Sequence, residues 1–159
     1  MESGLPLDIK KYPDKILRSK CQVVEEITEN EIRIFEMMVY TMQYFGGIGL
    51  AAPQVGIPSR LIIAGVGNRI VKLANPQIIE TKGRDKMAEG CLSIPNIRVE
   101  VKRPYEVVIE GINEKGKLTQ IKAKGLLARV LQHEIDHLNG KLIIDYMGIF
   151  GKLKLKLKG

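Results

Sequence analysis

The only two histidines of this chain, His133 and His137, lie four residues apart in the segment QHEIDHLNG. Residues four apart share one face of an α-helix, so both imidazoles can reach one metal ion while Glu134 stands beside them as a proton carrier. Apolar residues recur at helical spacing through this segment and Gly140 follows as a stop signal, which predicts a helix over about residues 126–139. If the two histidines bind a metal ion, the fold must bring a third ligand to this helix face. The alternative to a metal site is a helix whose histidines are only surface or capping residues.

A second helix is predicted nearer the N-terminus. Thr28 and Glu31 form a capping-box pattern, apolar residues follow at helical spacing, and Gly46 and Gly47 end the run. Between residues 60 and 121 the pattern changes to short β-rich segments. The predicted strands are 61–66, 97–101, 106–112 and 118–121, with a hairpin turn at 113–116 and a further strand at 142–144. These elements predict an α+β domain in which antiparallel β-strands pack around a central metal-bearing helix.

Length and composition limit the class of protein. With 159 residues, 45% of them hydrophobic, the chain has the size of one compact domain with a proper core. It contains no apolar run long enough for a membrane span and no signal-peptide pattern, so we expect a soluble, cytoplasmic protein without a membrane partner. Two cysteines do not make a disulfide framework. We therefore predict one catalytic metallohydrolase domain over residues 1–151.

Residues 152–159 form a basic tail in which Lys and Leu alternate, and its four lysines supply four of the seven net positive charges. Such a tail can contact RNA or an anionic membrane, and from its charge alone we hypothesise a contact with ribosomal RNA. The alternative is a solvated end that keeps the protein soluble, because no RNA-binding aromatic pattern accompanies the charge. We expect no DNA partner.

The two usual ways of completing this histidine motif both fail. Catalytic zinc-type sites use three protein ligands and leave one position open for water. Where metzincins carry a third histidine, this chain has Ile143, and Glu134 is its last glutamate, which excludes a thermolysin-like third ligand. Asp145 is a weak carboxylate candidate that is more typical of a cap or an ion pair.

Cysteine is the remaining ligand type. Cys21 lies in the polar stretch RSKCQ, which predicts a surface or half-buried thiol. Cys91 lies in EGCLSIP, where Gly90 removes a side chain beside the thiol and Pro95 stiffens the exit of the segment. Taken alone, Cys91 is typical of a small core residue. Beside two histidines that lack a third partner, it becomes the best ligand candidate.

Three separated motifs occur in the chain: GIGLAAPQ at 47–54, EGCLS at 89–93 and QHEIDH at 132–137. Together they resemble the motifs G-x-G-L-A-A-x-Q, E-G-C-L-S and Q-H-E-x-D-H of the peptide deformylase family, in the same order and at similar spacing. The similarity in layout covers approximately residues 8–146. It implies a peptide-deformylase-like fold and hydrolysis of the N-formyl group from the N-terminal formyl-methionine of newly made polypeptides.

The resemblance also implies roles for individual residues. Glu134 would act as general base and acid for a metal-bound hydroxide, while the Gln54 side chain and the Leu92 backbone N–H would donate to the developing oxyanion. The implied metal ion is Fe²⁺ in the cell, with Zn²⁺, Ni²⁺ or Co²⁺ as alternatives, because this donor set suits all four. The implied ligands are Cys91, His133 and His137.

A pocket for the methionine side chain is expected beside this centre. Arg129 departs from several relatives, which leaves the rim or the shape of the pocket open, and Arg98 resembles a residue that contacts the substrate further along. The substrate-binding candidates that the resemblance implies are Ile48, Gly49, Glu89, Gly90, Arg98, Leu126, Arg129 and Val130.

Two other functions remain open at this stage. One is a metallopeptidase with an unusual cysteine ligand, and the other is a non-catalytic module in which the metal only holds the fold. Closed structural sites use four ligands, whereas this chain offers three good ligands and Glu134, which favours catalysis.

Overall fold

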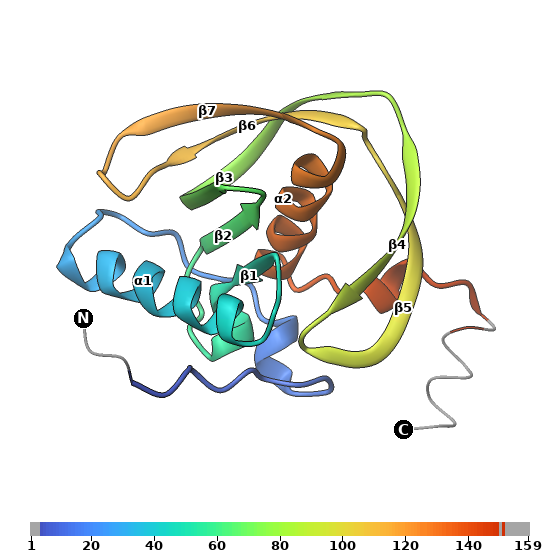
Figure 1. Ribbon diagram of the computed structural model, residues 1–159, viewed down its shortest axis with the longest axis horizontal. Coiled ribbons are helices and arrows are strands. Elements are labelled where there is room, and N and C mark those ends of the chain that lie inside the picture. Colours follow the sequence, from blue (N-terminus) through green and yellow to red (C-terminus); the bar gives the residue numbers. More distant parts are fainter. Residues whose placement is uncertain (1–3, 150, 152–159) are drawn as a thin grey trace.

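The computed structural model describes residues 4–149 and 151, and the basic tail at 152–159 lies outside these described residues. In chain order (Figure 1), the elements are η1 (Lys15–Arg18), α1 (Glu29–Tyr44), β1 (Gly49–Ala51), η2 (Ala52–Val55), β2 (Leu61–Val66), β3 (Arg69–Lys82), β4 (Asp85–Cys91), β5 (Ile94–Arg103), β6 (Glu106–Ile112), β7 (Leu118–Lys124), α2 (Gly125–Leu138) and η3 (Ile143–Tyr146). Within this part of the chain, no helix is long and apolar enough to cross a membrane.

The helix α2 is the central element of the domain. Five antiparallel strands form one sheet in the order β1-β2-β3-β6-β7, and α2 contacts every one of them. Figure 1 shows these strands arranged around the helix. Leu131 and Leu138 of α2 are fully buried against Ile62 and Ile109 of the sheet. The predicted α+β fold with a central helix is therefore confirmed.

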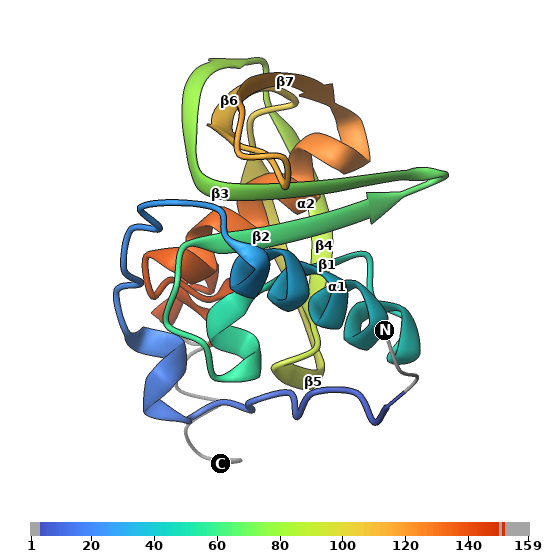
Figure 2. The same cartoon turned by 90° about the vertical axis from the view of Figure 1, so that its left-hand side faces the viewer.

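The second helix, α1, covers the other face of β2. Because side chains alternate between the two faces of a strand, Ile62 and Ala64 pack into the cluster around α2, whereas Leu61 and Ile63 pack against α1. Thr28 and the Glu31 side chain form the predicted capping box at the start of α1. Figure 2, turned by 90°, shows α1 running beneath β2.

The strands β4 and β5 form a separate two-stranded hairpin. Its strands are antiparallel and belong to a different sheet from the other five. Its apolar side, which includes Val99 and Val101, packs with Leu17 of η1 and with Ile143 and Ile144 of η3. The hairpin matters for the site because β4 ends at Cys91 while the two histidines lie on α2.

Two local predictions were wrong. Residues 142–144 are not a strand: the 3-10 helix η3 begins at Ile143, and Asp145 accepts a hydrogen bond from Leu142 N while pairing with Arg18. Leu142, Ile143 and Ile144 all pack into one cluster, and a short apolar run alone does not distinguish such a turn from a strand. Cys21 is buried rather than at the surface, because its backbone N–H bonds to the end of α2 and brings the thiol into the core.

The long strand β3 and the strand β4 were missed from the sequence. Most side chains in the second half of β3 are exposed, and β4 buries only Glu89. Polar strands of this kind carry little hydrophobic periodicity, because their backbone hydrogen bonds rather than their side chains hold them in the sheet.

Candidate metal centre and active site

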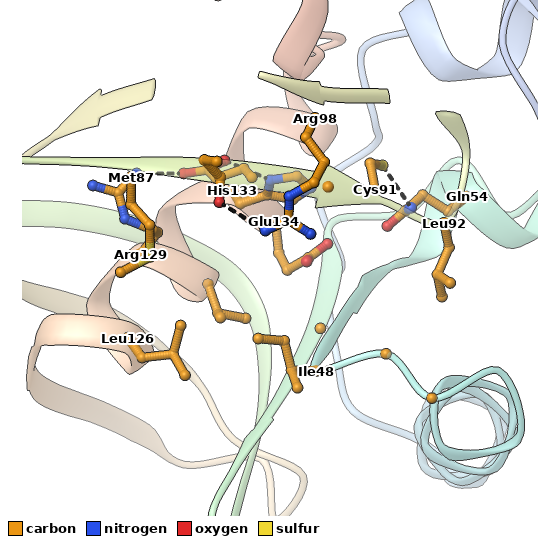
Figure 3. A pocket seen from close by; sticks show the side chains of 17 residues that line it. Ile48, Gln54, Met87, Cys91, Leu92, Arg98, Leu126, Arg129, His133 and Glu134 are labelled. Atoms are coloured by element: carbon orange, nitrogen blue, oxygen red, sulfur yellow. Dashed lines mark hydrogen bonds and ion pairs between the residues drawn. The ribbon is translucent and has the colours of Figure 1, made fainter. Parts of the chain in front are cut away.

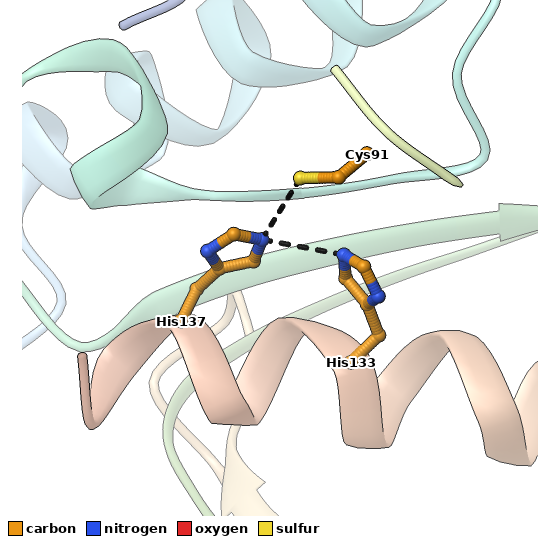
Figure 4. Close-up of side chains that lie close together, drawn as sticks. All are labelled: Cys91, His133 and His137. Carbon is orange, nitrogen blue, oxygen red and sulfur yellow. Dashed lines mark hydrogen bonds between the residues drawn. The ribbon is translucent and has the colours of Figure 1, made fainter. Parts of the chain in front are cut away.

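Three potential metal ligands meet where β4 ends beside α2. His137 Nε2 lies 3.4 Å from Cys91 Sγ and 3.3 Å from His133 Nε2, and the three donor atoms all lie within 4.8 Å of one another (Figure 4). The helical spacing of the histidines puts both rings on one face of α2, as the sequence predicts. Cys91 comes from the β4–β5 hairpin and lies 42 residues earlier in the chain than His133.

The two separations from His137 Nε2 fit donors that share one ion. Zinc-type bonds of about 2.0–2.1 Å to nitrogen and about 2.3 Å to sulfur place two nitrogens about 3.3 Å apart and a nitrogen and a sulfur about 3.6 Å apart. The observed separations lie within about 0.2 Å of those values. His133 Nδ1 bonds to the Glu89 carboxylate at 2.9 Å, which leaves Nε2 facing the other donors. A carboxylate behind the ligating imidazole is a usual partner in metal sites.

The electrostatics of the three donors also favour a cation. Burial opposes charge on His133, but Glu134, Cys91 and Glu89 together raise its pKa to about 10. Burial and the charge of His133 lower the pKa of His137 well below its ordinary value. The neighbouring carboxylates thus create a site that attracts positive charge, which a divalent ion can supply in place of a proton.

Glu134 lies beside the donors and is almost completely buried. Its Oε1 atom has no hydrogen-bond partner among the described residues. Burial raises the pKa of its carboxyl group to about 7, although the charge of His133 acts in the opposite direction. A carboxyl group with this pKa can both accept and release a proton near neutral pH, which is what a general base and acid requires.

Gln54 points its amide nitrogen at the same centre. It lies in η2, where its Oε1 accepts a hydrogen bond from Ala51 N at 2.9 Å. This bond fixes the orientation of the amide, so Nε2 donates to Ser93 Oγ at 3.1 Å and lies 3.5 Å from Cys91 Sγ. The donor is therefore held in place before any substrate arrives, as oxyanion stabilisation demands.

The Glu89 carboxylate lies at the centre of a buried network of ion pairs. Arg103 donates from Nε and Nη2 to its two oxygens at 2.6 and 2.9 Å. Burial raises the pKa of Glu89, but the bonds from Arg103 and His133 outweigh it and lower the pKa to about 2. Arg103 Nη1 continues the network to Asp136 and to the hydroxyl of Tyr146.

Arg103 was not predicted as a site residue, although a signal for it exists. Val99, Val101 and Arg103 are all buried at alternate positions of β5, so Arg103 occupies an inward position of a period-two pattern. The adjacent sequence KRP resembles an exposed, charged strand end. The identity of its acidic partner was hidden because Glu89 and Asp136 lie far away in sequence.

A pocket of about 490 Å³ opens in front of Glu134 (Figure 3). Its wall includes every residue predicted to bind substrate, together with Met87, which the sequence did not indicate. Ile48 and Leu126 are each nearly half exposed at its mouth, while Val130 is buried deeper. The predicted substrate residues are thus brought together: Ile48, Gly49, Glu89, Gly90, Arg98, Leu126, Arg129 and Val130.

The two arginines of the pocket differ in their surroundings. Arg98 is exposed and donates to Ala88 O at 3.3 Å. Arg129 is only 4% exposed, and its guanidinium group bonds to Glu89 and to backbone carbonyls of β4 and β5. Arg129 therefore presents its aliphatic stem rather than its charge to the pocket.

Gly49 shows how closely the strand β1 approaches the carboxylate of Glu134. A Cβ atom at this position would collide with Glu134 Oε2 and would lie 2.6 Å from Val130 Cγ1. Both neighbours are buried on α2, so neither can move away easily. Only glycine fits without displacing the catalytic candidate.

We expect Gly49→Ala to lower kcat for amide hydrolysis by about 10²-fold, because a shift of about 1 Å in a reacting group has an effect of this size. Overpacking should also lower the free energy of unfolding by about 1–3 kcal/mol. Gly148→Ala is the matched control, since a Cβ there meets nothing within 4 Å. Full activity of Gly49→Ala would show that Glu134 need not hold its position.

Comparison with known proteins agrees with this geometry. The family model for polypeptide deformylase matches residues 6–151. A peptide deformylase of Halothermothrix orenii is 50% identical over 141 residues, which cover 87% of this chain and 92% of that protein. The crystal structure of the Thermotoga maritima peptide deformylase superposes with a TM-score of 0.88 at 40% identity, covering 91% of this chain and 99% of that one. The crystal structure of a Synechococcus elongatus peptide deformylase in complex with actinonin superposes with a TM-score of 0.91 at 37% identity. This match covers 99% of this chain and 87% of that one. The chain belongs to the polypeptide deformylase family.

Proposed function

We propose that this chain removes the N-formyl group from the N-terminal formyl-methionine of newly made polypeptides. The observation that carries the proposal is the meeting, in one pocket, of a Cys-His-His donor set, the buried carboxylate of Glu134 and the fixed amide of Gln54. Water adds to the formyl carbon, the carbon–nitrogen bond breaks, formate leaves and the amine takes a proton. We assign the catalytic domain to residues 1–151.

The metal ion and the side chains have separate roles in the proposed reaction. When held by Cys91, His133 and His137, a divalent ion would supply positive charge that lowers the pKa of water from 15.7 to about 7. Glu134 takes the proton of the attacking water and later gives it to the leaving amine. Its buried, unpartnered Oε1 supports this role, because nothing else in the described chain competes for that oxygen.

Gln54 stabilises the charge that develops on the formyl oxygen. Its Nε2 already faces the centre, and the bond from Ala51 keeps it there. We assign the second donor to the backbone N–H of Leu92, which follows the Cys91 ligand at the pocket wall. One donor of this kind contributes about 10²–10³-fold to kcat.

The pocket selects methionine by shape and polarity. Its wall combines Ile48, Leu126, Val130 and the stem of Arg129, which suits an unbranched apolar side chain. We propose that Arg98, exposed at the mouth, contacts the peptide beyond the first residue. We propose the same for Gly90, whose missing side chain leaves room for peptide backbone.

Formate release from formyl-Met-Ala, acetyl-Met-Ala and unformylated Met-Ala tests the function. We expect formate from the first peptide and no hydrolysis of the other two. Cleavage of the Met-Ala bond would instead indicate a metallopeptidase. A protein that binds metal yet hydrolyses none of the three would indicate a metal that only holds the fold.

We propose Fe²⁺ as the ion in the cell, with Zn²⁺, Ni²⁺ or Co²⁺ able to occupy the same donors. Metal analysis of protein purified without air, together with formate release from the same sample, tests this identity. Formylated chains are made where translation takes place, so we place the enzyme in the cytoplasm.

We also propose that the basic tail, residues 152–159, contacts ribosomal RNA; its charge alone supports this idea. Deleting the tail should weaken cosedimentation with ribosomes, most clearly at low salt, and leave hydrolysis of formyl-Met-Ala unchanged. Equal ribosome binding by the two proteins would remove the proposal.

A further inference from the structure

We propose that Arg129 is a positioning residue for the metal centre, which it serves by fixing the cysteine-bearing hairpin against the histidine-bearing helix. The inference rests on the proposed function, because it assumes that Cys91 and the two histidines hold one ion. Arg129 does not touch that ion or the reacting atoms. It acts through Glu89 and through the backbone of β4 and β5.

The centre needs such a connection because its ligands come from two structural units. Cys91 ends β4, which pairs only with β5, whereas His133 and His137 lie on α2 inside the five-stranded sheet. No backbone hydrogen bond of either sheet joins the hairpin to the larger sheet in the described chain. The distance from sulfur to the ring nitrogens therefore depends on side chains that cross between the units.

Arg129 makes this crossing at three points. Nη1 donates to Glu89 Oε2 at 2.7 Å and to Val101 O at 2.8 Å, and Nη2 donates to Asp85 O at 2.8 Å. All three acceptors belong to the hairpin, while Arg129 itself lies on α2, one turn before His133. The planar guanidinium group holds several acceptors in a fixed arrangement, which an ammonium group cannot do.

The bond to Glu89 extends the effect to a ligand. Glu89 Oε1 is the partner of His133 Nδ1, and Oε2 is shared by Arg129 and Arg103. The orientation of the His133 ring thus depends on a carboxylate that Arg129 helps to hold. Outer partners of this kind typically change metal affinity by about 10–100-fold when they are removed.

The same geometry argues against a role for the Arg129 charge in substrate recognition. The guanidinium group is buried and fully engaged on its hairpin side. Figure 3 shows the side chain reaching toward the hairpin and away from Leu126 and Ile48 at the pocket mouth. Its loss should therefore affect metal retention and kcat before it affects KM.

Two variants and a matched control test the proposal. Arg129→Met keeps the aliphatic stem and removes all three bonds, and Arg129→Lys keeps the charge but cannot reach three acceptors at once. Arg60→Met is the control, because Arg60 bonds to Leu138 O and Asn139 at the opposite end of the same helix and not to the hairpin. Each folded protein is titrated with Co²⁺ against a chelator, and the Cys91-dependent absorption of bound Co²⁺ is recorded.

We expect Arg129→Met to bind Co²⁺ at least about tenfold more weakly and Arg129→Lys to fall between it and the unchanged protein, while Arg60→Met binds normally. With saturating Co²⁺, kcat should fall more than KM rises. If Arg129→Met does not fold, Arg129→Lys decides the question. Unchanged Co²⁺ affinity in a folded Arg129 variant, or an equal loss in Arg60→Met, would overturn the inference. If the unchanged protein itself shows no Cys91-dependent Co²⁺ absorption, the proposed metal centre fails instead.

Discussion

Glu134→Gln is expected to lower kcat for formate release by about 10²–10⁴-fold while the protein stays folded and keeps its metal. The amide has nearly the same shape as the carboxylate but cannot take a proton from the attacking water. Folding should not suffer, because Glu134 is buried and its Oε1 has no partner in the described chain, so a neutral group replaces a poorly solvated one. Formate release and metal content measured on one sample separate loss of chemistry from loss of the ion.

Glu110→Gln is the control for this substitution. Its carboxylate accepts a hydrogen bond from Gln120 on β7, far from the pocket lining, so its activity should be unchanged. If Glu134→Gln retained its metal and hydrolysed formyl-Met-Ala at the original rate, Glu134 would not be the proton carrier.

Cys91→Ala is expected to abolish the metal centre and, with it, formate release. A structural zinc site binds with about 10–16 kcal/mol over four ligands, so the loss of one ligand corresponds to about 10²–10³-fold weaker binding. The two histidines that remain should therefore lose the ion to a chelator. Metal content after dialysis against a weak chelator, with formate release beside it, measures the effect.

Cys21→Ala is the matched control for the ligand assignment. Cys21 has the same side chain as Cys91, but it lies in the core cluster around α2 and is not one of the three donors. It should lose about 1 kcal/mol of stability from a small cavity and keep both metal and activity. Metal retention by Cys91→Ala would mean that another group, and not this thiol, completes the site.

Some parts of the fold could be predicted because neighbouring residues determine them. The Thr28 capping box and the apolar spacing that follows define α1, and the same spacing defines α2 with its two histidines on one face. The strand β3 could not be found in this way, because its second half is exposed on both faces. The segment at residues 142–144 was predicted as a strand and is a 3-10 turn, because three apolar residues fit both elements equally well.

The candidate site, too, could be predicted from the sequence only in part. The residue types and the helical spacing pointed to a metal hydrolase, and the failure of both protease patterns left Cys91 as the best candidate for the third ligand. The period-two pattern of β5 placed Arg103 on the buried side, but nothing local indicated that Arg103 and Arg129 would share the carboxylate of Glu89, which lies 14 and 40 residues away from them. A buried charge of this kind is stable only when its distant partners come together.

The sequence by itself determined the chemistry: two histidines four apart, a cysteine in a glycine-bearing segment and a glutamate beside the first histidine are properties of residue type and short spacing. Only the tertiary structure decided how these groups are held. It placed Cys91 Sγ and His133 Nε2 at 3.4 and 3.3 Å from His137 Nε2, desolvated Glu134, left no room for a Cβ at Gly49, and joined hairpin to helix through Arg129. Those features depend on the packing of segments distant in the chain, because distances and burial arise only when separate elements share one core.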